Sequence, residues 1–326
     1  YVNSAERESM SEDLAPGPLL DPSLVETTLR VALSKGGEWA ELFAEDRQSA
    51  SSSFDEGRVD SMSSSRDRGV GIRVTVGEIT GFAHTSDLSP QGLKEAAEVA
   101  ASAATSSSRT TLVALNGDGL ASSRVKMLPS LVSKESKVAL LRRADEAARS
   151  AGSAISQVTV GYSEGRRRIL VANTAGIFRA DDQVRTLFSV NCVATGDQGL
   201  QTGRETVGYT VGYELFEEND VEALAKRAAS RAITKLRARP APSGELPVVI
   251  KNGGGGVLFH EACGHGLEAD LVKKGASVFK DRIGQQVASS LVTLIDDGTM
   301  GVEWGALSID DEGAFTQSNT LIENGV

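Results

Sequence analysis

Hydrophobic and polar positions alternate with two different periods along the first 236 residues, which predicts a mixture of helices and strands. Apolar residues recur with helical spacing after Asp21-Pro22-Ser23 and stop at Gly36-Gly37, so we expect a first helix there. Strict alternation from Val70 to Val76 and a turn at Gly77-Glu78 predict a hairpin. The remaining predicted helices cover residues 89–104, 136–151 and 221–236, and the remaining predicted strands cover residues 40–44, 49–53, 79–83, 157–162, 169–172, 184–194 and 202–213.

Turn-forming residues separate several of these strands. Asp55-Glu56-Gly57 predicts a turn after a serine-rich edge strand at residues 49–53, and Glu164-Gly165 predicts another between two shorter strands. Residues 105–133 are polar and show little periodicity, so we expect an exposed connection there.

The order helix, strands, helix occurs twice, and two interpretations of this order remain open. One is an internal duplication in which two similar halves build a mainly antiparallel sheet with packed helices, and the other is a single irregular α+β domain. The proline-containing stretch at residues 237–244 cannot continue the preceding helix, so we place a domain junction there. The predicted organisation is a disordered tail at 1–20, an N-terminal α+β domain at 21–239 and the start of a strand-rich C-terminal domain at 240–326.

The C-terminal domain is predicted to contain strands at residues 291–295, 304–309 and 319–322. Asp296-Asp297-Gly298 and Asp310-Asp311-Glu312-Gly313 lie between these strands. Paired carboxylates can ligate a cation, but Asp and Gly between apolar runs are first of all turn residues, and we favour turns.

The candidate chemistry lies in the stretch Lys251–Asp270, KNGGGGVLFHEACGHGLEAD. An apolar run at residues 246–250, four glycines and a second apolar run predict a strand, a tight loop and a helix. That helix carries His260, Glu261 and His265, in a chain with only three histidines. The glycine run alone is weak evidence for phosphate binding, because it lacks the Gly-Lys-Ser/Thr ending of a P-loop.

The spacing of the two histidines requires a distorted helix if both bind one metal. A gap of four residues turns a regular helix by about 40°, whereas the gap of five from His260 to His265 turns it by roughly 140°. A π-bulge, or a bend at Gly264, would return both rings to one side. In that case His260 and His265 are candidate zinc ligands, and Glu261 is a candidate general base.

His84, Cys263 and Glu268 can each be explained without a role as a metal ligand. We assign a structural role to His84 and favour a small buried packing role over metal ligation for Cys263. Glu268 either orients a metal ligand or is an ordinary acid on the helix surface.

Composition limits the classes of protein that remain. A net charge of −10 argues against nucleic acid or an anionic membrane as the main partner, and no apolar run is long enough to span a bilayer. Residues 1–20 have no apolar core of a signal peptide, and the two cysteines show no pairing pattern. We therefore expect a cytoplasmic protein.

The run HEACGHGLEAD resembles the HExxxH segment of the TldD/PmbA family of zinc metallopeptidases, and specifically its TldD-like branch. The likeness continues through residues 271–323 and extends more loosely to the N-terminal region. The resemblance implies hydrolysis of oligopeptides or unfolded peptides, with His260 and His265 as Zn²⁺ ligands and Glu261 as the catalytic acid and base. It also implies a dimer, either with a TldE/PmbA-like homologue or with a second copy.

The same resemblance implies a third metal ligand, a cysteine farther along the C-terminal half. Neither Cys192 nor Cys263 is at that place in the sequence. Two interpretations follow: a fragment of a longer enzyme, or a naturally shortened relative with impaired metal binding. Two functions are therefore compatible with the sequence: a zinc-dependent peptidase, and a non-catalytic binding or scaffold subunit with an incomplete metal site.

Overall fold

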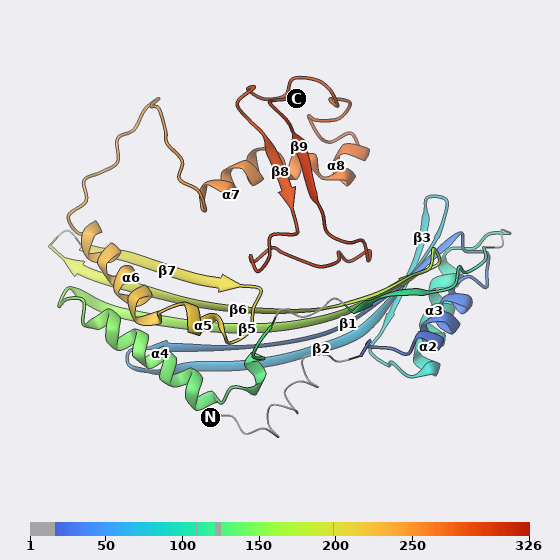
Figure 1. Cartoon of the computed structure of the whole chain (residues 1–326), viewed down its shortest axis with the longest axis horizontal. Coiled ribbons are helices and arrows are strands. Elements are labelled where there is room, and N and C mark those ends of the chain that lie inside the picture. The colour runs from blue at the N-terminus through green and yellow to red at the C-terminus, as the bar shows by residue number, and fades with distance from the viewer. Residues whose placement is uncertain (1–16, 108–109, 121–124, 198) are drawn as a thin grey trace. The chain divides into compact units, whose positions relative to one another are not determined.

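A curved sheet of long, mainly antiparallel strands organises the larger part of the chain (Figure 1). The computed structural model describes residues 17–107, 110–120, 125–197 and 199–326. The chain divides into a larger unit, comprising residues up to 238 together with 300–316, and a smaller unit, comprising residues 239–299 with 317–326. The mixed α+β fold class predicted from the sequence is confirmed.

In the described residues, seven strands form the sheet of the larger unit, in the order β3-β2-β1-β5-β6-β4, with β7 also paired to β6. All neighbouring pairs are antiparallel except the short β4, which is parallel to β6. The strands are β1 (Trp39–Asp55), β2 (Arg58–Val76), β3 (Ile79–Thr85), β4 (Asn116–Leu120), β5 (Ile155–Asn173), β6 (Ile177–Gly196) and β7 (Gly199–Tyr209).

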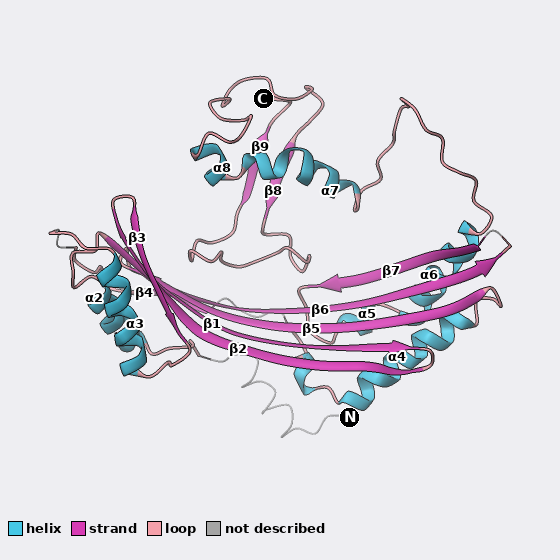
Figure 2. Ribbon diagram, turned by 180° about the vertical axis from the view of Figure 1, so that it is seen from behind, coloured by secondary structure: helices cyan, strands magenta, loops and turns pink. Residues whose placement is uncertain are grey.

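Helices cover one face of this sheet in two groups (Figure 2). Because successive side chains in a strand point to opposite faces, the even-numbered positions of β1, β5 and β6 supply the buried apolar side chains of this face. The helices are α2 (Pro22–Ala32), α3 (Pro90–Ala103), α4 (Lys134–Arg149), α5 (Leu215–Glu218) and α6 (Val221–Lys235), with a 3₁₀ turn at Pro129–Leu131. Asp21, Ser89, Ser133 and Asp220 cap α2, α3, α4 and α6 with their side chains.

Several local predictions for the larger unit are wrong. Glu164-Gly165 does not form a turn, because β5 runs without interruption through both residues. The serine-rich stretch at residues 49–53 lies in β1, an interior strand, and not at an edge. The connection at residues 105–133 contains β4 and the 3₁₀ turn. Of the predicted tail, residues 1–16 lie outside the described residues, and Leu20 is buried in the core at 6% exposure.

The face of the sheet opposite the helices is partly covered by residues 300–316, which are distant in sequence. Ile309 is 1% exposed and packs with Ile169 and Val171 of β5. A strand was predicted at residues 304–309, and this prediction is wrong: an isolated bridge joins Ile309 to Phe315 instead. The turn predicted at residues 310–313 is present, because Asp310 Oδ1 accepts hydrogen bonds from the backbone N–H groups of Glu312 and Ala314.

The smaller unit contains one antiparallel strand pair and a series of short helical turns. Its strands are β8 (Leu294–Asp297) and β9 (Ser318–Ile322), both close to predicted strands. The helical elements are α7 (Gly255–Phe259), a π-helix (His260–Gly264), a 3₁₀ turn (His265–Leu267) and α8 (Ala269–Lys273). The strand predicted at residues 246–250 is wrong, because these residues form no strand pairing with any described part of the chain. None of the helices in the described residues is both long and apolar enough to cross a bilayer.

Candidate metal centre

A single π-helical turn connects the two histidines of the motif. It covers His260–Gly264, and the backbone N–H of His265 donates to the carbonyl of His260, five residues earlier. The predicted distortion of the motif helix is therefore confirmed. A π turn spreads five residues over about one revolution, so His265 returns to the side of the helix that His260 occupies.

The π turn brings the two imidazole rings into contact. Their centroids are 4.4 Å apart and their planes are inclined by 70°. One ligand atom each from His260, Glu261 and His265 can be chosen so that all three lie within 4.8 Å of one another. Two nitrogens bound to one zinc, each at about 2.0–2.1 Å, lie no more than about 4.2 Å apart. Exposed side chains can make so small an adjustment, so these donors fit zinc.

Glu268 orients the second imidazole. Its Oε1 lies 2.8 Å from Nδ1 of His265, while Nε2 of the same ring lies 3.9 Å from Oε2 of Glu261. The hydrogen bond to Glu268 and the negative charges of Glu268 and Glu261 raise the pKa of His265 above its usual value. With Nδ1 engaged by Glu268, Nε2 is the nitrogen directed toward the cluster. Of the two interpretations of Glu268, this contact favours the orienting role.

The loop that follows α8 contacts the motif and supports it. Ser277 Oγ donates to the carbonyl of Gly266, and its oxygen also accepts from the backbone N–H of Phe279. A Cβ added at Gly266 would meet the Phe279 ring at 2.9 Å, so only glycine allows this close approach. Ser277 and Phe279 are thus supporting residues that the sequence reasoning did not identify.

Within the described residues, Cys263 and His84 are not members of the group of three clustered side chains. The Cys263 thiol donates to the carbonyl of Phe259 at 3.1 Å, as an intrahelical contact. His84 lies on β3, in the larger unit. Of the residues that the structure describes, His260, Glu261 and His265 are the group with metal-ligating geometry.

A cavity of about 730 Å³ borders the motif within the smaller unit. His260, Cys263 and Glu268 line one side, and residues 291–296, including the start of β8, line the other. Glu261 and His265 do not line this cavity. An elongated ligand in the cavity would therefore approach the cluster from the side of His260.

Family models for the PmbA/TldA metallopeptidase match the chain in order: domain 1 at residues 40–104, the central domain at 128–236 and the C-terminal domain at 243–326. The chain belongs to the TldD/PmbA family.

Curated relatives carry corresponding names. The chain is 36% identical to a metalloprotease TldD homologue of Buchnera aphidicola over 80% of its own length and 56% of that protein. It is 33% identical to the TldD homologue of Haemophilus influenzae over 89% of its length and 62% of that protein. The chain thus spans less than two thirds of the length of these relatives.

Solved structures share the fold. A candidate modulator of DNA gyrase from Thermotoga maritima superimposes with a TM-score of 0.77 at 21% identity, covering 93% of this chain and 69% of that one. TldE from Thermococcus kodakarensis superimposes with a TM-score of 0.70 at 21% identity, covering 93% and 68%. At this identity the likeness concerns the fold alone.

Proposed function

We propose that the protein is a zinc-dependent peptidase that hydrolyses oligopeptides or unfolded peptides. The observation that carries the proposal is the π turn, which gathers His260, Glu261 and His265 within 4.8 Å of one another. The names of the curated relatives support the same class of activity.

Each side chain of the cluster has a separate role in this proposal. His260 and His265 hold the metal, with Glu268 fixing the tautomer and orientation of His265. When bound, zinc supplies an acidified water and polarises the scissile carbonyl. Glu261 takes the proton from the attacking water and delivers it to the departing amine. The side chains of Glu261 and His265 are more than half exposed, so both are accessible to solvent and to a substrate.

The cavity beside His260 is the proposed position of the peptide. Apolar side chains of Leu291, Leu294 and Leu321 line part of it, and such a wall suits the side chains of an unfolded peptide. We further propose a dimer with a TldE/PmbA-like homologue or with a second copy, a proposal supported by the structural likeness to TldE.

The experiment combines metal binding with peptide cleavage on one preparation. Glu261→Gln is expected to retain zinc and to lose cleavage of an unstructured peptide by about 100-fold or more, because a general base contributes that much. Glu245→Gln, an exposed carboxylate outside the cluster, serves as the matched control and should cleave normally.

A second outcome supports the alternative function. Only two histidines and one carboxylate are gathered among the described residues, and catalytic zinc usually takes three protein ligands. A chain that cleaves no peptide at any zinc concentration would contradict the peptidase proposal and favour the non-catalytic binding or scaffold subunit.

A further inference from the structure

A cavity of about 480 Å³ lies on the larger unit, on the sheet face opposite the helices. Three adjacent strands form its floor, since Glu41 of β1 pairs with Arg73 of β2, and Arg73 pairs with Phe82 of β3. Phe43 and His84 line it from β1 and β3, and the turn at Asp311-Glu312 adds two acidic residues. The cavity thus combines acidic and aromatic side chains with the guanidinium of Arg73.

Glu41 is a buried carboxylate with unused hydrogen-bonding capacity. Its residue is 7% exposed, and its Oε1 accepts one hydrogen bond, from Arg73, at 3.1 Å. Its Oε2 is buried and has no hydrogen-bond partner among the residues that the structure describes. A buried carboxylate oxygen without a donor is costly, so this atom is suited to accept from a ligand.

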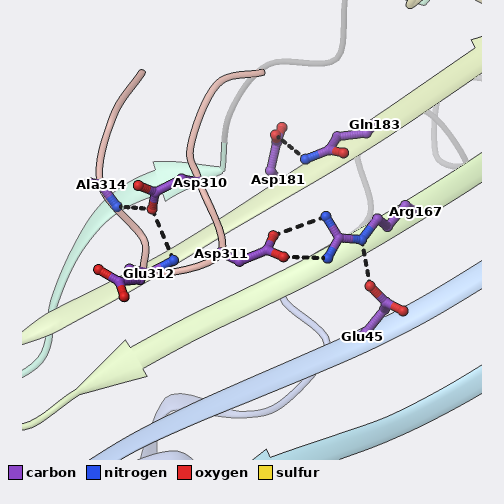
Figure 3. A network of polar contacts seen from close by, with 8 residues as sticks. All are labelled: Glu45, Arg167, Asp181, Gln183, Asp310, Asp311, Glu312 and Ala314. Atoms are coloured by element: carbon purple, nitrogen blue, oxygen red, sulfur yellow. Dashed lines mark hydrogen bonds and ion pairs between the residues drawn. The ribbon is translucent and has the colours of Figure 1, made fainter. Parts of the chain in front are cut away.

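The lining of the cavity contains more carboxylates than cationic side chains. Arg73 lies within 4 Å of two carboxylates, Glu41 at 3.1 Å and Glu312 at 3.9 Å. Asp311 is occupied, because Arg167 donates to both of its oxygens at 3.0 Å, as Figure 3 shows. One guanidinium therefore faces Glu41 and Glu312 together. Burial raises the pKa of Glu41, and the charges of Glu312 and Asp310 raise it further, whereas Arg73 lowers it.

The aromatic side chains distinguish an organic cation from a metal ion. Phe82 is 60% exposed, and its ring stacks on His84 with centroids 6.2 Å apart. A guanidinium or ammonium group gains favourable interaction over such ring faces. Within the described part of the chain, His260, Glu261 and His265 are the group whose ligand atoms lie close enough together to hold a metal ion. The acidic residues of this cavity do not form such a group.

We propose that this cavity binds a guanidinium or primary ammonium group carried on a chain of the length of an arginine or lysine side chain. Glu41 Oε2 accepts a hydrogen bond from the bound cation, Glu312 adds a second negative charge, and the rings of Phe82 and His84 lie against the cationic group. The same chemistry is offered by a free amine and by a basic side chain of a peptide. The proposal is independent of peptide hydrolysis.

Calorimetry with blocked ligands tests the proposal directly. Nα-acetylarginine amide is expected to bind the 326-residue chain saturably, and Nα-acetylcitrulline amide, which has nearly the same shape without the charge, is expected to bind about tenfold more weakly or not at all. EDTA in all samples removes any contribution from the histidine cluster. Agmatine and a blocked Ala-Ala-Arg-Ala-Ala peptide are measured in the same way. Whichever of these two ligands binds more tightly identifies the source of the cation, a free amine or a basic side chain of a peptide.

Matched variants locate the binding. Glu41→Gln and Glu312→Gln should each weaken acetylarginine amide, Glu41→Gln by about tenfold or more. Glu98→Gln, which removes an exposed carboxylate from α3, should leave binding unchanged. Glu312 lies on an exposed turn, so its variant keeps the test valid if Glu41→Gln does not fold. The proposal would be overturned if the citrulline ligand bound as tightly as the arginine ligand, or if both site variants bound acetylarginine amide as tightly as wild type. Absence of binding at roughly 10 mM ligand would overturn it as well.

Discussion

Individual ion pairs join the long strands of the larger unit. Arg66 of β2 donates to Asp46 of β1 through Nε and a terminal nitrogen, at 3.0 and 2.6 Å. The Asp46 side chain is nearly buried, whereas Arg66 is more than half exposed. The hydrogen bonds from Arg66 lower the pKa of Asp46 below its usual value of 3.8, although burial opposes them.

The stability of the protein should therefore depend on Asp46 in a pH-dependent way. Its folded-state pKa lies below the unfolded value, so its stabilising contribution is present above pH 3.8 and is lost as the pH falls through the folded pKa. Asp46→Asn should lower the free energy of unfolding by about 1–3 kcal/mol at pH 7. Urea denaturation at pH 7 and pH 3.5 measures the difference, which should shrink at the lower pH.

The exposed residue Asp60 provides the control for this prediction. Asp60→Asn should change the unfolding free energy little at either pH. A difference between wild type and Asp46→Asn that is the same at both pH values would show that the carboxylate charge is not responsible.

At the scale of elements, the histidine spacing was more informative than the strand pattern. The gap of five residues predicted an irregular turn because a regular helix could not bring His260 and His265 together, and the π turn has that geometry. The strand β5 was harder to predict. Glu164 and Gly165 suggested a turn, but Glu164 accepts from Lys137 of α4 and from Tyr162, a tertiary arrangement that stabilises a continuous strand.

The π turn itself makes a testable prediction about chain length. Deleting Ala262 would leave a gap of four residues, which a regular helix accommodates with both histidines on one side. The deletion variant should therefore bind zinc within about tenfold of wild type. Inserting one alanine after Ala262 would turn the second histidine away and should weaken zinc binding by about 100-fold or more. Zinc affinity in competition with a chromophoric chelator is the measurement.

The reverse ranking would be inconsistent with the proposed geometry. If the insertion binds zinc as well as wild type while the deletion does not, the π turn is not what brings the two rings together.

At the scale of the whole molecule, the segment at residues 300–316 links distant parts of the sequence. It follows 61 residues of the smaller unit, yet it packs on the sheet of the larger unit through Ile309 and through the ion pair between Asp311 and Arg167 (Figure 3). A local sequence pattern cannot predict such a contact. Alternating apolar and polar residues at 304–309 indicate only that one side of this segment is buried. For the same reason the sequence placed this segment as a strand of the C-terminal domain.

Truncation of Ile309 tests whether this packing stabilises the larger unit. Ile309→Ala should lower the free energy of unfolding by about 2–4 kcal/mol, since a buried aliphatic side chain is replaced by a cavity. Hydrogen exchange of the β5 amides near Ile169 and Val171 should become faster. Ile283→Ala, at a fully exposed position, is the control. Unchanged protection of β5 in Ile309→Ala would contradict a stabilising role.

Zinc-edge X-ray absorption spectroscopy of the zinc-loaded chain shows directly which side chains hold the metal. If His260 and His265 hold the metal, the spectrum should contain scattering from two imidazoles, and His260→Ala and His265→Ala should each lose one. His84→Ala is the control and should leave the spectrum unchanged, because His84 is not one of the residues proposed to hold the metal. Imidazole scattering that persists unaltered in both motif variants, or that disappears in His84→Ala, would contradict the proposed metal centre.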